Sequence, residues 1–145
     1  MKKIGEYTVR GSAADNEVTR IKLFDGRFDT AYRVVKFVVA GLDMTSTSQT
    51  DVNGSLGTTE DAPGSSWNWG DNRQIGWASL RGIESAAVGD PFNLIDKDNL
   101  VVQDLFIYVN GNGSSQINYY IEMEKYDITD WQGALAMVRN AAQNV

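Results

Sequence analysis

The sequence predicts an all-β fold, an antiparallel β-sandwich of jelly-roll type that ends in a short amphipathic helix. Runs rich in β-branched and aromatic residues recur at short intervals, and clusters of turn residues separate them. The alternation of strand and helix patterns that is typical of parallel sheets is missing. Strand lengths vary and one connection is long, which favours a jelly roll. At 145 residues, the chain is expected to form a single domain over 1–145.

The first half of the chain contains a few predicted strands and one long loop. Residues 6–10 are expected to form a short strand, and 18–39 is interpreted as a hairpin because two β-rich runs flank a turn dipeptide. Residues 41–66 are rich in Ser, Thr, Gly and Asp. We expect them to form a long surface excursion with thin edge strands near 44–47 and 55–59.

The second half is organised around another predicted hairpin. The β-rich runs 99–109 and 116–126 flank a doubled Asn-Gly, which tolerates the positive φ of tight hairpins. The second run has one apolar face, whereas the first is apolar on both. We therefore place the first run centrally in its sheet, with its outer face against the C-terminal helix or a neighbouring subunit. A strand is also expected at 74–80, and a turn at Pro91.

The end of the chain has the pattern of a capped helix over about 129–142. Thr129 and Gln132 fit a capping box, in which each side chain answers a backbone N–H of the first turn. Apolar residues then recur at helical spacing, and this stripe is expected to pack onto the sheet or its end. The stripe consists of Trp131, Ala134, Leu135, Val138 and Ala142, and the opposite face carries Gln132, Arg139, Asn140 and Gln143.

Composition excludes several classes of function. The chain has no cysteine and no histidine, which removes disulfides, thiolate metal sites, Ser-His-Asp and Cys-His nucleophile systems and the commonest zinc ligand. The net charge of −6 argues against nucleic acid as a partner. No apolar run approaches the roughly 20 residues of a membrane helix. We expect no cofactor and no membrane partner, and a protein made in the cytoplasm.

Three tryptophans form the clearest candidate site. Trp67, Trp69 and Trp77 lie beside polar loop residues, and flat apolar rings with nearby polar groups are a common way to hold a sugar. The same rings would also serve to cap an open end of the sandwich or to pack at a subunit contact. Both interpretations stay open on the sequence alone.

The acidic residues give no catalytic or metal-binding pattern. Asp96 to Asn99 begins like a calcium loop, but Leu100 stands where a ligand is required, so a polar turn is expected. A glycan hydrolase needs only two carboxylates and is a third hypothesis. Glu122 and Glu124 would lie about 7 Å apart on the outer face of one strand, but any acidic protein offers such a pair. We expect no enzymatic activity. Asp104 lies among large apolar residues, which predicts either a buried acid paired with a basic residue or an acid at an interface. Arg33 and Arg73 are the candidate partners.

Several phrases of the chain after about residue 18 carry a family resemblance. They are LFDGRF at 23–28, followed by Tyr32 and Phe37; QIGW at 74–77; DNLVVQDL at 98–105; and INY at 117–119, running to YDIT at 126–129 and WQGAL at 131–135. Together they resemble small structural proteins of marine tailed phages. The resemblance implies a virion protein made in the host cytoplasm, acting in capsid decoration or as a vertex or knob component. It transfers no catalytic residue.

The resemblance and the residues together give two alternative functions. The first is a structural virion protein that forms a homo-oligomer, with a trimer favoured by capsid symmetry, and binds the major capsid protein. The second is a carbohydrate-binding module that uses the three tryptophans to attach to host surface glycans. The expected partner-binding residues are Trp67, Trp69, Trp77, Phe106, Tyr108 and Trp131.

Overall fold

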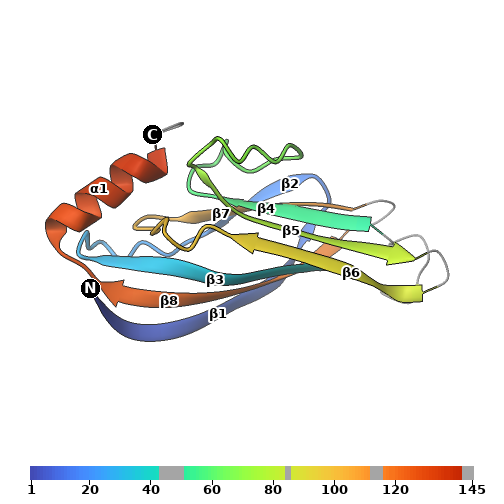
Figure 1. The fold of residues 1–145 in the computed structure, drawn as a ribbon, viewed down its shortest axis with the longest axis horizontal. Coiled ribbons are helices and arrows are strands. Elements are labelled where there is room, and N and C mark those ends of the chain that lie inside the picture. The colour runs from blue at the N-terminus through green and yellow to red at the C-terminus, as the bar shows by residue number, and fades with distance from the viewer. Residues whose placement is uncertain (43–50, 84–85, 112–115, 142–145) are drawn as a thin grey trace.

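The computed structural model describes residues 1–42, 51–83, 86–111 and 116–141, and the side chains of 81–90, 130 and 131 lie outside this description. The chain is mostly β, in two antiparallel sheets with one C-terminal helix, which confirms the coarse prediction (Figure 1). The elements are β1 (Lys2–Ala14), β2 (Glu17–Ile21), β3 (Thr30–Gly41), β4 (Asp51–Gly57), β5 (Gln74–Ile83), β6 (Ala86–Ile95), β7 (Leu105–Gly111), β8 (Gln116–Asp127) and α1 (Asp130–Ala141).

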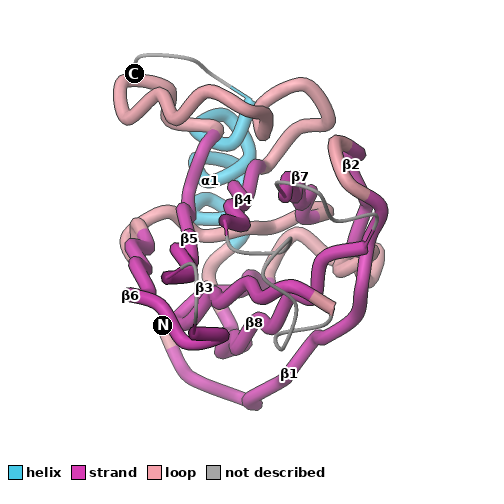
Figure 2. Tube along the Cα trace, turned by 90° about the vertical axis from the view of Figure 1, so that its right-hand side faces the viewer, coloured by secondary structure: helices cyan, strands magenta, loops and turns pink. Residues whose placement is uncertain are grey.

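The eight strands are divided between a three-stranded and a five-stranded sheet. The smaller sheet has the order β1-β8-β3, and the larger has the order β2-β7-β4-β5-β6. Figure 2 shows β1, β8 and β3 along the lower side of the molecule, with β4, β5 and β7 above them. The chain therefore crosses from one sheet to the other after β1, β2, β3 and β7.

The predicted hairpin between 99–109 and 116–126 is wrong in its pairing. β7 pairs with β2 and β4, whereas β8 pairs with β1 and β3, so the two strands lie in different sheets. A hairpin would have placed the two apolar faces side by side, and facing sheets bury them in one core instead. The strand also begins later than predicted, because Val101 forms only a single bridge with Tyr32 before β7 starts.

Other predictions of strand placement are partly wrong. The 18–39 hairpin is divided between the sheets in the same way, since β2 pairs with β7 and β3 with β8. The run near 55–59 belongs to β4, which lies between β7 and β5 rather than at an edge. Pro91 stands within edge strand β6, where a residue without an N–H is tolerated. β5 confirms the strand at 74–80, and the strand predicted at 44–47 lies outside the described residues.

The inner faces of the two sheets share one apolar core. Alternate residues of the strands point into it, as the period of two requires. The fully buried members include Phe37 of β3, Leu56 of β4, Leu105, Ile107 and Val109 of β7, and Ile117, Ile121 and Met123 of β8. Burying a side chain of this size stabilises the fold by about 1.5–3 kcal/mol. The core therefore fixes which faces of β7 and β8 point inward.

The capping box of α1 is confirmed. The backbone N–H of Gln132 donates to Thr129 Oγ1 at 3.1 Å, and the backbone N–H of Thr129 donates to Gln132 Oε1 at 3.0 Å. These reciprocal bonds satisfy two donors that a helix start would otherwise leave unpaired. The local sequence is thus sufficient to set where the helix begins.

The face of α1 that packs on the protein differs from the predicted one. Leu135 and Val138 of the apolar stripe are 49% and 63% exposed, whereas Asn140 is buried. The Asn140 amide donates to Asn99 Oδ1 at 3.0 Å and to the Leu100 carbonyl at 2.8 Å, and its oxygen accepts a bond from the Val102 N–H at 3.4 Å. Because an unpaired buried amide would cost about 1–3 kcal/mol, this polar anchor outweighs the apolar pattern.

A close approach at Gly133 fixes the other end of the same helix face. A Cβ built on Gly133 would lie 1.8 Å from the carbonyl oxygen of Phe28, in the connection between β2 and β3. Only a residue without a side chain permits this contact between helix and backbone. Gly133 and Asn140 are seven residues apart, so they lie on one face and together set the rotation of α1.

The substitution Gly133→Ala is expected to destabilise the chain although alanine is the better helix former. Helix propensity alone favours alanine by about 1 kcal/mol. The clash with Phe28 is expected to outweigh this gain and to lower the free energy of unfolding by roughly 1–3 kcal/mol, as measured by urea denaturation. Gly64→Ala is the matched control, because a Cβ there meets nothing within 4 Å. Equal stability of the two variants would contradict the assigned contact.

Candidate functional site

The connection between β4 and β5, residues 58–73, folds over the outer face of the five-stranded sheet, and we call it the flap. The Gly64 N–H donates to Ser55 Oγ at 3.1 Å, and the same hydroxyl donates to the Gly64 carbonyl at 3.2 Å. A Cβ on Gly57 would lie 2.6 Å from Pro63 Cδ, so the flap packs directly onto β4. In Figure 1 the flap is the green loop above β4 and β5.

Gln74 is the buried residue that pins the flap. Its Nε2 donates to the carbonyls of Ala62 at 2.9 Å and Ser66 at 3.2 Å. Its Oε1 accepts bonds from the Asn68 N–H at 2.9 Å and from Trp77 Nε1 at 3.0 Å. These four bonds use both amide hydrogens and both oxygen lone pairs, so one side chain ties the flap to the sheet.

An ion pair closes the far end of the flap. The Arg73 side chain donates from Nη2 to Asp71 Oδ2 at 2.8 Å and from Nε to Asp71 Oδ1 at 3.0 Å. The backbone N–H of Arg73 also donates to Asp71 Oδ1 at 3.0 Å. The bonds from the Arg73 side chain lower the pKa of the Asp71 carboxyl, and they outweigh the opposite effect of burial. The exposed carboxylate of Asp61 lies 3.3 Å from Arg73 Nη1 on the outer side.

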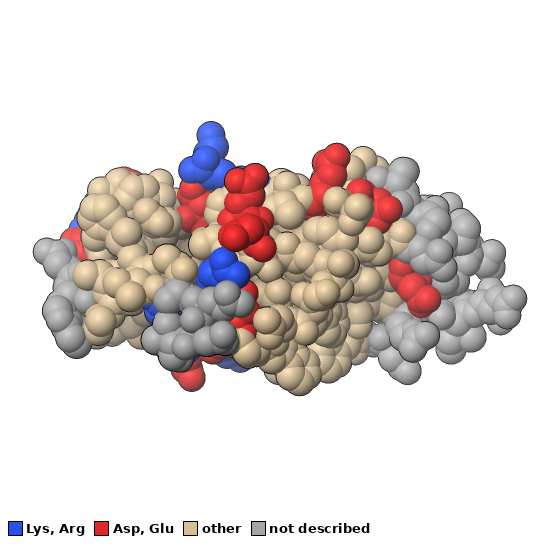
Figure 3. Space-filling view, turned by 90° about the horizontal axis from the view of Figure 1, so that it is seen from above, with Lys and Arg blue, Asp and Glu red and all other residues tan. Residues whose placement is uncertain are grey.

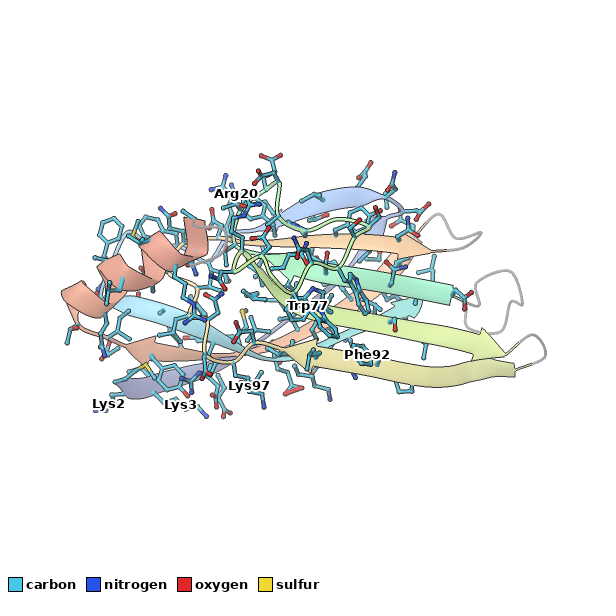
Figure 4. All side chains as sticks on the ribbon, turned by 45° about the horizontal axis from the view of Figure 1, so that its top comes forward. Lys2, Lys3, Arg20, Trp77, Phe92 and Lys97 are labelled. Carbon is cyan, nitrogen blue, oxygen red and sulfur yellow. The ribbon has the colours of Figure 1, made fainter. Side chains whose placement is uncertain are left out.

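The structure brings the three predicted tryptophans to one region but in different environments. Trp77 of β5 is only 5% exposed, and Trp69 on the flap is 64% exposed and meets the Trp77 ring edge-on at 6.1 Å. Trp67, also on the flap, is half-buried and stacks on Phe92 of β6, with ring centroids 5.7 Å apart. Figure 4 shows Trp77 and Phe92 on the same side of the sheet. The rings therefore do not form one flat platform.

A groove of about 360 Å³ lies beside Trp67. Asp51 and Asn53 of β4 and Ser79 of β5 contribute side chains to it, and Trp67 and Ser65 of the flap form one wall. Asn53 and Ser79 are directly opposed across the strand pair. Val52 also borders it, and we call the hollow lined by these six residues the Trp67 groove. The floor was not predicted from the sequence, because short polar residues on an alternating strand do not distinguish a binding site from ordinary solvent exposure.

The outward-facing aromatic residues of β7 are partly covered by this chain itself. Tyr108 is 5% exposed, and its hydroxyl donates to Asn16 Oδ1 and accepts a bond from Asn110 Nδ2 at 3.2 Å. Phe106 is half-buried and borders a hollow of about 250 Å³ that it shares with Glu60 of the flap. The Tyr108 ring therefore offers a partner little surface. Trp131 lies outside the described side chains, and its predicted role stays a prediction.

A second exposed apolar area lies at the end of the molecule where α1 packs. A groove of about 620 Å³ runs between α1 and the β2–β3 connection, lined in part by Phe28, Ala134 and Met137. Phe28 is 47% exposed and lies 5.3 Å from the ring of Phe24, which is 38% exposed. We call this area, together with the exposed helix residues beside it, the helical end; it consists of Phe24, Phe28, Ala134, Leu135, Met137 and Val138.

Asp104 is a buried, paired acid, which is the first of its two predicted roles, but its partner is neither of the predicted arginines. It accepts bonds from Arg20 Nε at 2.7 Å and from the N–H groups of Leu23 at 3.0 Å and Phe24 at 3.2 Å. Burial acts to raise the pKa of the Asp104 carboxyl, but these hydrogen bonds outweigh burial and lower it. Arg20 lies opposite Phe106 in the β2–β7 pair, which brings it beside Asp104. This acid joins β2 to the loop before β7.

The remaining acidic candidates have structural surroundings. Glu122 and Glu124 each form an ion pair with a lysine of a neighbouring strand in the smaller sheet. Lys36 Nζ lies 3.8 Å from Glu122 Oε2, and Lys3 Nζ lies 2.8 Å from Glu124 Oε2. The polar turn at 96–99 is confirmed by a bond from the Asn99 N–H to the Asp96 carbonyl at 3.3 Å. Within the described residues, no group of three or more acids is placed to hold a metal ion. None of the helical residues described forms a span long and apolar enough to cross a membrane.

The charge on the flap side of the molecule is unevenly distributed. Figure 3 shows charged side chains of both signs near the middle of this face and separate acidic patches toward one end, with uncharged residues between them. Arg73 is tied to Asp71 and Asp61, and Arg20 to Asp104, so the basic side chains named here serve ion pairs within the chain. These basic groups are therefore already engaged within the chain and are not free to bind an anionic ligand.

Acid is expected to loosen the flap. The pKa of Asp71 is lower in the folded chain than its unfolded value of about 4. Its ion pair therefore contributes its full stabilisation above that pH, and this stabilisation is lost as the pH falls through the folded pKa. Asp71→Asn is expected to lower the free energy of unfolding at neutral pH by roughly 1–3 kcal/mol and to reduce its loss below about pH 4. Asp61→Asn, which removes the exposed carboxylate, is expected to cost less than about 1 kcal/mol.

Urea denaturation and indole fluorescence, each followed from neutral pH to about pH 2, measure these effects. Trp69 and Trp77 lie under or on the flap, so its loosening is expected to change their emission. If Asp71→Asn matched the wild type at every pH, the role assigned to the Asp71–Arg73 ion pair in closing the flap would be wrong.

Comparisons of the chain with models of protein families, with characterised proteins and with solved structures find no match.

Proposed function

We propose that the chain is a non-enzymatic structural protein of a phage virion, a capsid decoration or vertex component that associates with its own copies and binds the capsid shell. The observation that carries the proposal is the helical end. Phe24, Phe28, Leu135 and Val138 are all large and apolar, and each is 38–63% exposed. Contiguous exposed apolar surface typically marks a protein contact.

The exposure of the helical end is built into the packing of α1. Rotating the helix to bury Leu135 and Val138 would break the three hydrogen bonds of the Asn140 side chain. It would also remove the contact that only glycine permits at position 133. The apolar face is thus presented on a fixed support, and such pre-organisation reduces the entropy lost on association.

We further propose that the two sheets form a β-sandwich of jelly-roll type. The orders β1-β8-β3 and β2-β7-β4-β5 fit two interleaved Greek keys, in which the sixth strand would lie beside β3. Here β6 pairs with β5 instead. It still contacts β3, because the Asn93 side-chain amide, in the orientation that satisfies its hydrogen bonds, donates to the Phe37 carbonyl at 2.6 Å. Jelly rolls are common in viral capsid proteins and in lectins, so this architecture supports the proposal without selecting it.

Self-association is proposed to be closed and symmetric, with three copies favoured because a capsid offers three-fold positions. Outward-facing Leu135 and Val138 lie one turn apart on α1, so copies related by an axis near the helical end would bring these residues together. The major capsid protein is the other proposed contact. The resemblance to marine phage structural proteins supports this role.

Val138→Asp is the variant that tests the proposal. A charge in the centre of an apolar contact is expected to weaken self-association and binding to shells by about tenfold or more, which corresponds to about 1.4 kcal/mol. Sedimentation velocity measures self-association, and co-sedimentation with empty capsids of the parent phage measures shell binding. Ser12→Asp is the control, since it adds the same charge at an exposed position on β1 of the other sheet. A wild-type chain that stays monomeric when concentrated and does not bind the capsids would overturn the proposal.

A further inference from the structure

We propose that the Trp67 groove binds a neutral saccharide. This inference is independent of the helical end and goes beyond a role in assembly. It also differs from a platform of three tryptophans, because Trp67 is the one of the three that lines the groove. The site is built from a polar floor on two adjacent strands and an aromatic wall on the flap, the combination that orients small polar ligands.

The floor offers hydrogen-bonding groups that the chain does not use. Asn53 and Ser79 face outward side by side, and within the described residues neither side chain makes a hydrogen bond. The neighbouring row of the same face is different: Ser55 bonds to Gly64, and Tyr108 bonds to Asn16. An amide and a hydroxyl together supply three donors and several acceptors, which suits the hydroxyl groups of a sugar.

The wall is held rigid by contacts on both sides of Trp67. Gln74 bonds to the Ser66 carbonyl and to the Asn68 N–H, the residues immediately before and after Trp67. The indole itself stacks on Phe92 with 23° between the ring planes. A half-buried ring fixed in this way is prepared to cover the apolar C–H face of a pyranose without losing side-chain freedom on binding.

Size and charge define the class of ligand. A volume of about 360 Å³ lies at the lower end of ligand sites and suits one or two sugar rings. No basic side chain lines the groove among the described residues, and Asp51 lies at one end. The chain carries a net charge of −6, which disfavours sulfated, sialylated or uronic acid ligands. The geometry therefore points to neutral hexose units.

Trp69 provides a matched control for Trp67. Both are tryptophans of the flap, but Trp69 does not line the groove and its ring lies against Trp77. Asn53→Ala provides the second test variant, because its side chain makes no bond within the described part of the chain whose loss would unfold the protein. Its unfolding curve is expected to match that of the wild type.

The experiment titrates the full chain with maltose, lactose and mannobiose, using calorimetry and saturation-transfer NMR. We expect at least one of these disaccharides to bind with a Kd on the order of 1 mM, an affinity typical of a small open site. Trp67→Ala is expected to weaken this binding by about tenfold or more and Asn53→Ala by about threefold or more, whereas Trp69→Ala stays within about twofold.

Two results would overturn the inference. One is the absence of binding to all three disaccharides at about 20 mM, well above the expected Kd. The other is binding that Trp69→Ala abolishes while Trp67→Ala and Asn53→Ala leave it unchanged. Val138→Asp is expected to bind the saccharide as the wild type does, so failure of the assembly proposal and failure of this one are distinguishable.

Discussion

The burial of β7 against β8 across the interior is the constraint on which the rest of the structure depends. Each strand carries an apolar face, and neither can satisfy it by pairing with the other in one sheet. With Ile107 on one side of the core and Ile121 on the other, both faces are closed at once. β7 then becomes the second strand of the larger sheet, and β8 the centre of the smaller one. The two outer faces consequently differ in chemistry: one is a network of charged pairs, and the other carries the flap and its aromatic rings.

Polar side chains determine how the pieces outside the two sheets are attached. Gln74 holds the flap, Asn140 holds the helix, and Asp104 holds the end of β2. Each is buried and makes several hydrogen bonds, so each is costly to displace. The exposure of the apolar residues near them is then set by where these polar side chains are bonded. Leu135 and Val138 are exposed for this reason, and the surface proposed for assembly is a result of where Asn140 lies.

Local signals in the sequence predicted what is decided locally. The capping box at Thr129 set the start of the helix, and alternation along 116–126 identified the strand and its inner face. The partners of strands were not predictable in this way. Two runs joined by Asn-Gly satisfy every short-range rule for a hairpin. They lie in different sheets because both bury their apolar faces in one shared core, which is a long-range effect. The arginine that pairs with Asp104 was missed for the same reason, because register between β2 and β7 brings Arg20 there.

The candidate sites followed the same division. Tryptophans are rare and large, so their presence predicts a candidate site. The floor beside Trp67 includes Asn53 and Ser79, which are residue types common on any solvent-facing side of a strand and predict nothing. Likewise, the helical pattern alone assigned Asn140 to the solvent side. Whether a polar residue is anchored, free or buried depends on neighbours that are distant in the chain, and the sequence pattern does not contain them.

Pro91 limits how molecules of this kind can meet. It stands in β6, the outermost strand of the larger sheet, and it offers no N–H to a further strand. The opposite border, β2, is only five residues long. Backbone templating of one molecule by the next is therefore blocked at one border and brief at the other. Two molecules that met along the borders of the larger sheet would therefore touch mainly through side chains, and that sheet would not extend from one molecule into the next as a continuous ribbon.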